Sequence, residues 1–290
     1  MSTEGIGVLV GVDESACSQE ALAWAEADAA AKGVALTIAT VVDLPRLADV
    51  PLSAELVGTA ELAAWRRVAA AAARSRDVVR GVPVLGRALV GDAPAELLRL
   101  AAGADEVVVG SHGTGRFGGL LIGSVGSRVA EHAPCPAVVV RGRPRTGPVV
   151  VGIDNSPHSD AALEYGFAYA DRHGLPLVGL HVYTLGAFVY PAVPYPVPPY
   201  GIEQELARIR AEVVRAAEHS LEVLTQKYPE VQARMDVAEG AAAEKLVEAS
   251  RTASLLVLGT RGHGRLAGML LGSVSHAAIR HAHCPVVIAR

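Results

Sequence analysis

The chain has 290 residues, of which 51% are hydrophobic and 19% are charged, and its formal net charge is −4. This length holds either one large domain or two of about 100–150 residues, each able to bury a core of its own. The lysines and arginines are scattered rather than gathered into a basic stripe, which argues against nucleic acid as a partner.

Apolar runs in the sequence are short. Residues 69–73 and 107–110 are soon followed by Arg or Gly, so neither approaches the roughly 20 apolar residues that span a bilayer. The N-terminus enters a strand pattern directly, without the basic start and cleavage site of a secretory leader. Cys17, Cys135 and Cys284 are too few and too dispersed for a disulfide framework. We therefore expect a cytoplasmic protein without a membrane partner.

Strands and helices alternate in the first half of the sequence. Runs rich in Val, Ile and Leu predict strands at residues 6–12, 36–42, 83–90, 106–110 and 137–141. Helical patterns fill the intervals, at residues 18–32, 53–80, 94–102 and 124–133. This alternation is typical of βαβ units on a parallel sheet, and near-continuous apolar strands imply helices on both faces.

The second half repeats the first. Residues 110–141 align without a gap to residues 259–290, with about half the positions identical. The strands predicted there are 149–153, 177–183, 233–238, 255–258 and 286–289. A Gly- and Pro-rich joint at Gly142–Pro148 separates the halves, so we predict two equivalent domains, 1–145 and 146–290.

A proline-rich segment from Tyr190 to Tyr200 breaks the symmetry of the two halves. Its prolines lack amide donors and favour extended polyproline geometry, which predicts a loop after the second strand of the second domain. Two interpretations stay open: a spacer or lid, and a docking strip for a protein partner with an aromatic-lined groove.

The fourth predicted strand of each half runs into a glycine-rich loop that ends at a helix beginning with Ser. Glycines let the backbone approach a ligand closely and turn its amides inward. The helix start adds unpaired amides and a positive dipole end, while Arg116 or Arg265 can neutralise charge from the side. The two loops are Gly110-Ser-His-Gly113-Thr-Gly-Arg116-Phe-Gly-Gly-Leu-Leu-Ile-Gly123-Ser124 and Gly259-Thr-Arg-Gly262-His-Gly-Arg265-Leu-Ala-Gly-Met-Leu-Leu-Gly272-Ser273. This pattern predicts an anion site in each half.

The spacing Gly-2x-Gly-9x-Gly-Ser, found twice, resembles the ATP-binding signature of the universal stress protein family, especially its tandem-domain bacterial members. The resemblance covers essentially the whole chain, including the strand ends at Asp13 and Asp154 and the helix starts after Gly91 and Gly240. It implies two tandem α/β domains, each a Rossmann-like open five-stranded parallel sheet similar to the adenine nucleotide α-hydrolases, with strand order 3-2-1-4-5. In that order the turn after strand one lies beside the loop after strand four, where open α/β sheets place ligands.

The resemblance implies that each domain binds ATP, alone or with Mg²⁺. In the first domain it assigns adenine and ribose to Gly11, Val12, Asp13, Val41, Val42 and Asp43. It assigns the phosphates there to Gly110, Ser111, His112, Gly113, Thr114, Gly115, Arg116, Gly123, Ser124 and Val125. The second-domain equivalents are Gly152, Ile153, Asp154, Val182, Gly259, Thr260, Arg261, Gly262, His263, Gly264, Arg265, Gly272, Ser273, Val274 and Ser275. Asp43 is matched by Thr184, so a polar contact to ribose is weaker in the second domain and occupancy can differ between the sites.

Several of these residues have a second interpretation. Asp13 and Asp154 either contact the ligand or cap the next helix, and His112 and His263 either contact phosphate or fill the surface. The stretch 113–118 also fits a dinucleotide fingerprint, but it follows the fourth strand rather than the first, which argues against NAD or FAD. The sequence has no Walker A lysine, which excludes a P-loop NTPase.

A metal site is not expected at the C-terminal His281-Ala-His283-Cys284. The first half has Glu131, His132, Ala133, Pro134 and Cys135 in that region, which does not preserve the set of ligands.

The sequence lacks recognisable catalytic machinery: no paired carboxylates, no base aimed at a γ-phosphate and no catalytic residue to name. We expect an ATP-binding regulator of stress or dormancy that is not an enzyme beyond slow hydrolysis. The alternatives are an ATP-using enzyme and a nucleotide-independent interaction module. The resemblance also implies dimerisation through the last strands, 137–141 and 286–289, either between chains as a homodimer or within one chain.

Overall fold

The computed structural model describes residues 5–43, 53–113, 122–141, 146–184, 202–262 and 270–290. The chain divides into two compact units. The first unit comprises Met1–Pro144 together with Ile279–Ile288 and Arg290, and the second comprises Arg145–Ala278 together with Ala289.

The first unit alternates strands and helices along the chain. Its elements are β1 (Val8–Gly11), α1 (Ala16–Lys32), β2 (Leu36–Val42), α2 (Ala54–Val78), β3 (Val84–Val90), α3 (Ala93–Ala101), β4 (Glu106–Gly110), α4 (Ser124–His132), β5 (Ala137–Val140) and, from the end of the chain, β10 (Val286–Ala289). Strands β1 to β5 are parallel and run in the order β3-β2-β1-β4-β5. This is the strand order that the family resemblance implies.

Strand β10 pairs with β5 in antiparallel register, Val287 opposite Val138. The first unit therefore has a sixth strand beyond the five expected for one domain. The edge of β5 is therefore covered by a strand of the same chain. Of the two predicted contacts between the last strands, between chains or within one chain, this is the one within the chain. The physical reason is that both strands are apolar and fully buried, so an open edge at β5 would expose backbone amides and apolar side chains to water.

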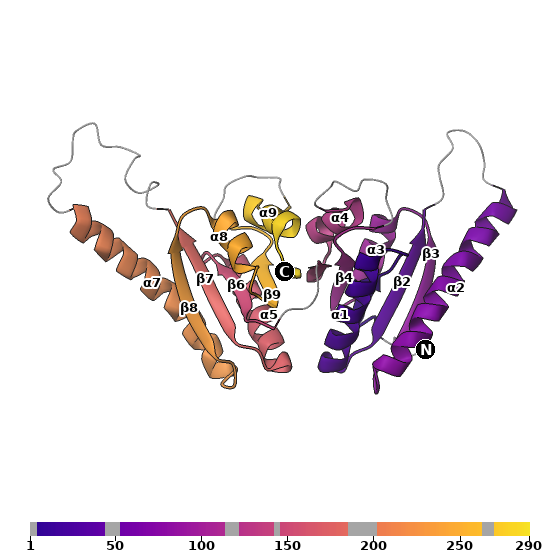
Figure 1. The fold of residues 1–290 in the computed structure, drawn as a ribbon, viewed down its shortest axis with the longest axis horizontal. Helices are drawn as coiled ribbons and strands as arrows, with labels where there is room; N and C mark the ends of the chain where they lie inside the picture. Colours follow the sequence, from indigo (N-terminus) through magenta and orange to yellow (C-terminus); the bar gives the residue numbers. More distant parts are fainter. Residues whose placement is uncertain (1–4, 44–52, 114–121, 142–145, 185–201, 263–269) are drawn as a thin grey trace. The chain divides into compact units, whose positions relative to one another are not determined.

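Capping residues set where the helices begin and end, and packing on the sheet sets where they lie. Ser15 caps α1, because its side chain accepts a hydrogen bond from Ser18 N, and Gly33 ends the helix in the left-handed conformation at φ 67°. Helix α2 lies along β2 and β3 (Figure 1). The centre of the sheet is buried, since the side chains of Val8, Leu9 and Val10 are 0% exposed.

The second unit repeats this plan. Its elements are β6 (Val149–Ile153), α5 (Pro157–His173), β7 (Leu177–Tyr183), α7 (Ile202–Lys227), β8 (Ala233–Glu239), α8 (Ala242–Ala249), β9 (Leu255–Gly259) and α9 (Ser273–His281), whose end lies in the first unit. Its described strands are parallel, in the order β8-β7-β6-β9. Figure 1 shows α7 alongside β8, as α2 lies alongside β3 in the first unit.

Successive residues of β6 face opposite sides of the sheet. Gly166 of α5 lies against Val149 and Val151, whereas Gly152 lies against Leu246 of α8. Helices therefore cover both faces, as the apolar strands predict.

The predicted segment Tyr190–Tyr200 lies outside the described residues. In the part of the chain that the structure describes, no helix has the length and apolar character needed to cross a bilayer.

Candidate functional site

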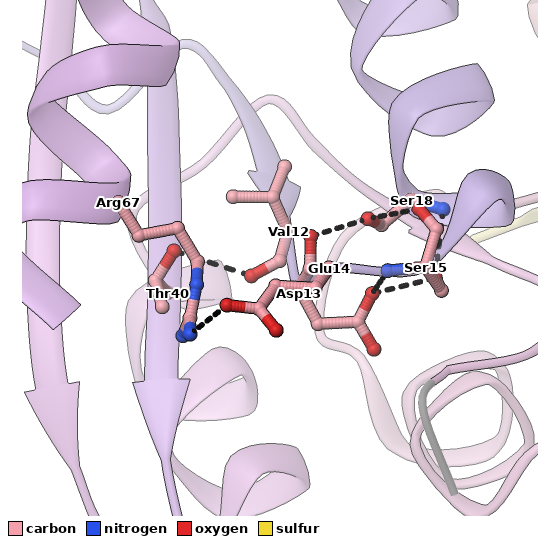
Figure 2. A network of polar contacts seen from close by, with 7 residues as sticks. All are labelled: Val12, Asp13, Glu14, Ser15, Ser18, Thr40 and Arg67. Atoms are coloured by element: carbon pink, nitrogen blue, oxygen red, sulfur yellow. Dashed lines mark hydrogen bonds and ion pairs between the residues drawn. The ribbon is translucent and has the colours of Figure 1, made fainter. Parts of the chain in front are cut away.

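A tight turn follows β1 in the first unit. The Asp13 Oδ1 atom accepts hydrogen bonds from Ser15 N at 2.9 Å and from Ser15 Oγ at 2.5 Å (Figure 2). Ser15 Oγ in turn accepts from Ser18 N at 3.1 Å. The cap of α1 is thus Ser15 rather than Asp13, and Asp13 holds the turn that precedes the helix.

The same turn is held from the second strand and the second helix. Thr40 Oγ1 on β2 donates to Val12 O at 3.2 Å, and Arg67 of α2 forms an ion pair with Glu14 at 2.5 Å (Figure 2). The Thr40 contact is buried, whereas Glu14 is 70% exposed, so the ion pair contributes little to stability. The turn is therefore fixed mainly by backbone-directed hydrogen bonds.

The glycine loop of the first unit meets this turn. A Cβ atom at Gly113 would lie 2.7 Å from Asp13 Oδ2, closer than real Cβ atoms come, so a larger residue there would require the Asp13 carboxylate to move. Ser15 Oγ also lies 3.2 Å from His112 O. The loop closes on itself through Gly123 N, which donates to Ser111 O at 2.7 Å. The structure thus brings together the ends of strands one and four, as the predicted strand order requires.

Helix α4 opens at the far end of that loop. Gly123 occupies its N-cap position and supplies no side-chain hydrogen bond, and Ser124 and Val125 form the first turn. A helix start without a side-chain cap has amides available to an anion. The predicted residues Thr114, Gly115 and Arg116 lie outside the described residues.

The second unit builds the same arrangement from the repeated residues. Asp154 Oδ1 accepts from Ser156 N at 3.1 Å, and a Cβ atom at Gly262 would overlap Asp154 Oδ2. Gly272 N donates to Thr260 O at 2.7 Å and closes the loop as Gly123 does in the first unit. Asn155 follows Asp154 with a positive φ of 61°, a conformation that Asn tolerates better than most residues.

A cavity of about 270 Å³ opens between this turn, the loop and the surrounding strand ends of the second unit. Most of the residues predicted for the second site line it: Gly152, Ile153, Asp154, Val182, Gly259, Arg261, Gly262, Gly272, Ser273, Val274 and Ser275. Thr260 is buried beside the lining, where its hydroxyl lies 3.2 Å from His158 Nδ1. His263, Gly264 and Arg265 lie outside the described residues.

The cavity has further lining residues that the sequence analysis missed. These are Ser159, Leu180, Ala242, Leu246, Leu258 and Leu271. Of these, Leu246 is the residue that the sequence could have indicated. It lies one helical turn after Ala242 at the start of α8, so both residues are on the same face of the helix. The leucines make an apolar slot, and the glycine loop supplies a polar end to it.

The predicted difference between Asp43 and Thr184 has a structural counterpart. Thr184 Oγ1 donates to Gly240 O at 3.0 Å, so its hydroxyl proton is engaged by the loop before α8. Asp43 is exposed at the end of β2. The first site thus has a carboxylate at a position where the second has a hydroxyl that is already hydrogen-bonded.

His181 of β7 contacts the carbonyl of Ile153, one of the residues that line the cavity of the second unit. Its Nδ1 atom lies 2.9 Å from Ile153 O, at the position that Thr40 has in the first unit. Burial lowers the pKa of His181 from 6.5, although the Ile153 carbonyl and the Asp154 carboxylate favour the charged form. In its neutral form, a ring that donates from Nδ1 to a buried carbonyl is the Nδ1–H tautomer.

Among the described residues, no group of three or more His, Cys, Asp or Glu side chains is placed to hold a metal ion. His112 Nδ1 lies 3.0 Å from Ser111 Oγ in the first loop. The arrangement in each unit therefore combines loop amides, a helix start and one aspartate, and in the second unit an apolar slot beside them. Such a site is suited to a ligand with an apolar ring at one end and anionic groups at the other.

Comparison with known proteins agrees with the repeat. The model of the universal stress protein family matches the chain twice, over residues 7–141 and 146–290. Universal stress protein Rv1996 of Mycobacterium tuberculosis is 33% identical over 309 aligned residues, which cover 98% of this chain and 95% of that protein. Universal stress protein Rv2623 of the same organism is 31% identical over 302, covering 98% and 96%.

A solved structure shows the same fold. The universal stress protein of Archaeoglobus fulgidus superposes with a TM-score of 0.68 at 20% identity, covering 99% of both chains. With two family matches and near full-length similarity to curated relatives, the chain belongs to the universal stress protein family.

Proposed function

We propose that each unit of this chain binds an adenine nucleotide, with ATP as the principal ligand, and that the protein is a cytoplasmic regulator of stress or dormancy. Its output would be a conformation or assembly state that follows the bound nucleotide. The observation that supports this proposal most directly is the cavity of the second unit, which lies at the meeting point of the turn, the second strand and the glycine loop.

The chemistry of the lining fits the two ends of a nucleotide. Leu180, Leu246 and Leu258 offer an apolar slot of the kind that a purine ring fills, and the amides of Gly262 and of the α9 start offer donors to phosphate. Arg261 adds a positive charge at the rim. A volume of about 270 Å³ is near the lower end of the range for small-molecule sites, about 300–1,000 Å³.

We propose that ATP is held rather than turned over quickly. The carboxylate in the lining, Asp154, accepts a hydrogen bond from the turn, which is a structural use of its lone pairs. In each loop the described residues offer amides rather than an oriented base for a water molecule. ATP that is recovered intact after long incubation would support binding without catalysis, whereas many turnovers per hour would favour the enzyme alternative.

Release of the bound ligand tests the proposal. The purified full chain is heat-denatured, and the released small molecules are identified by mass and compared with total protein. We expect up to two adenine nucleotides per chain, and calorimetry of stripped protein with ATP and Mg²⁺ should show heat of binding. No heat with any adenylate would overturn the proposal.

A matched pair of variants localises the binding. Gly262→Ala places a Cβ atom onto Asp154 Oδ2, whereas Gly58→Ala adds one in open space on α2. We expect the first to remove one equivalent of nucleotide and the second to bind as the wild type does. Unchanged binding in Gly262→Ala would place the ligand elsewhere.

We also propose that the chain forms a homodimer. Because β10 already covers the edge of β5, the contact between chains must use another surface. Light scattering with and without ATP measures the state and its response to nucleotide, and a monomer at all concentrations would overturn this part.

A further inference from the structure

Three titratable side chains meet in the interior of the first unit, and one of them, Glu106, lies at the end of β4 opposite to the glycine loop. Lys32 Nζ lies 2.7 Å from Asp28 Oδ2 and 2.6 Å from Glu106 Oε2. The Glu106 side chain is 0% exposed, that of Asp28 is 1% exposed and that of Lys32 is 16% exposed. Two buried carboxyl groups therefore share one ammonium group.

The charged groups that shift the Glu106 pKa are Asp28 and Lys32, and Lys32 is the cation of the two. On β4, Asp105 precedes Glu106 and adds a negative charge. Arg290, after β10, donates to Cys135 O at 3.2 Å and to Ala130 O at 2.6 Å, so it is held by carbonyls. Burial, with the charge of Glu106 as a second cause, raises the pKa of the Cys135 thiol to about 11, which keeps that thiol neutral.

The charge count determines the protonation state. If both carboxyls were ionised, the cluster would leave a net charge of −1 in the interior, and an uncompensated buried charge is strongly unfavourable. One retained proton makes the cluster neutral. Burial, and next the Asp28 carboxylate, raise the pKa of Glu106 from 4.5 to about 8, although Lys32 acts in the opposite direction.

We propose that Asp28, Lys32 and Glu106 form a proton-binding site, which holds one proton between the two carboxyls at neutral pH and releases it to solvent as the solution becomes alkaline. The partly exposed Lys32 marks the side from which water reaches the cluster. Because the two carboxyls are coupled, the proton belongs to the pair rather than to one residue.

The second unit does not repeat these three residues. The repeat places Tyr169, His173 and Leu255 where the first unit has Asp28, Lys32 and Glu106. The Tyr169 and His173 rings stack with centroids 4.1 Å apart. Only the first of the two units is thus built to respond to protons in this way.

The cluster joins two elements that serve the nucleotide site at their other ends. Lys32 ends α1, whose start is capped by Ser15 in the turn, and Glu106 begins β4, which ends at Gly110 in the loop. Proton release leaves an unbalanced negative charge between these elements and weakens their packing. The proposal concerns the stability of the first unit and holds whether or not a nucleotide binds.

The sign of the pH dependence follows from linkage. The folded cluster holds its proton up to about pH 8, whereas the unfolded Glu106 releases it near its ordinary pKa of 4.5. The stability that the proton provides is therefore full below pH 4.5 and is lost as the pH rises through about 8. Each pH unit in this window lowers the folding equilibrium constant by up to about tenfold.

Tryptophan fluorescence isolates the first unit in the full chain, because Trp24 and Trp65 are its two tryptophans and the chain has no others. Urea unfolding is measured from pH 6 to pH 9. We expect the urea concentration at the midpoint of the fluorescence transition to fall as the pH rises to 8. This dependence on pH should disappear in Glu106→Leu, which copies Leu255. Asp105→Asn, a change at the exposed neighbour, should keep the wild-type slope.

A second measurement observes the carboxyl groups of the wild-type chain directly. Carbon-13 NMR of the side-chain carboxyls in the wild-type chain should show one group of the Asp28–Glu106 pair titrating above pH 6. Glu106→Gln identifies the signal and keeps the shape of the side chain. Titration of both carboxyls below pH 5, or the same slope in wild type and Glu106→Leu, would overturn the proposal.

Discussion

At the scale of single residues, the turn after β1 depends on Ser15. Its hydroxyl donates to Asp13 Oδ1, accepts from Ser18 N and lies near His112 O, so one side chain links the helix start, the turn and the glycine loop. Ser156 caps α5 in the same way, by accepting from Ser159 N at 3.3 Å. The turn and the first helix of each unit are thus ordered together.

Replacement of Ser15 tests this role. Ser15→Ala removes the cap of α1 and a hydrogen bond to Asp13, and we expect the first unit to lose about 1–2 kcal/mol of unfolding free energy. Tryptophan-monitored urea unfolding measures it. Ser15→Asp, which retains a capping oxygen, should recover part of the loss, and a Ser15→Ala midpoint equal to that of wild type would contradict the role of the cap.

His181 gives the second unit an acid sensitivity. Its pKa in the folded state is lowered by burial, so the unfolded chain takes up a proton first as the pH falls. The contribution of the neutral ring is therefore complete above pH 6.5 and is lost as the pH falls through the folded-state value.

Proton NMR of the imidazole signals checks this prediction. We expect the His181 signal, identified by its absence in His181→Thr, to titrate below pH 6.5. His181→Thr copies Thr40 and should make the second unit less sensitive to acid. If His181 titrates at or above pH 6.5, the prediction is wrong.

At the scale of elements, strands were the easiest feature to predict. The predicted ranges 36–42, 106–110 and 177–183 coincide with β2, β4 and β7, because short Val- and Ile-rich runs between polar or glycine-containing segments have few other uses. Helix ends were displaced by one or two residues, as at α1, which begins at Ala16 rather than Ser18. The turn and loop residues were predicted from the repeat and from the resemblance.

Contacts between distant residues could not be predicted in the same way. Leu180 and Leu246 read as ordinary core residues, and only the fold places both on one cavity. Asp28 and Lys32 are recognisable as an i, i+4 pair, but nothing local indicates that Glu106 is buried against them. Such features depend on how strands and helices pack, for which a single sequence contains no direct signal.

The third helix of the first unit, α3, and the third helix of the second unit, α8, differ in their N-terminal caps. Asp92 caps α3 by accepting from Ala95 N at 3.2 Å and also forms an ion pair with Arg128, whereas Ala241 at the start of α8 offers no side-chain hydrogen bond. Ala241→Asp should therefore stabilise the second unit by about 0.5–1 kcal/mol. Hydrogen exchange of the α8 amides measures the change, and faster exchange in the variant would contradict it.

At the scale of the whole molecule, the end of the chain completes the first unit. Strand β10 pairs with β5, and Arg290 bonds two carbonyls around the end of α4. The reciprocal bond runs from Arg141, after β5, to Ile279 O in α9 at 3.2 Å. Residues 279–288, which belong to the second family match in sequence, therefore group with the first unit in the fold.

Removal of residues 286–290 tests that dependence. The truncation uncovers the apolar edge of β5, where Val138 and Val139 are fully buried, and removes the Arg290 bonds. We expect the tryptophan-monitored midpoint of the first unit to fall, although both tryptophans lie more than half the chain away in sequence, because the lost strand belongs to that unit. The exposed edge should also pair between chains, so the mean molecular mass measured by light scattering should rise with protein concentration.

Arg290→Ala separates the two causes, since it keeps β10 and removes only the guanidinium bonds to Cys135 O and Ala130 O. It should lower the midpoint less than the truncation does and should leave the light scattering at the wild-type level, because the β5 edge stays covered. A truncated chain whose first unit unfolds like wild type would mean that β10 adds no stability to β5. Equal losses in both variants would instead assign the stabilisation to the arginine, and the strand would then serve to keep the edge from pairing with other chains.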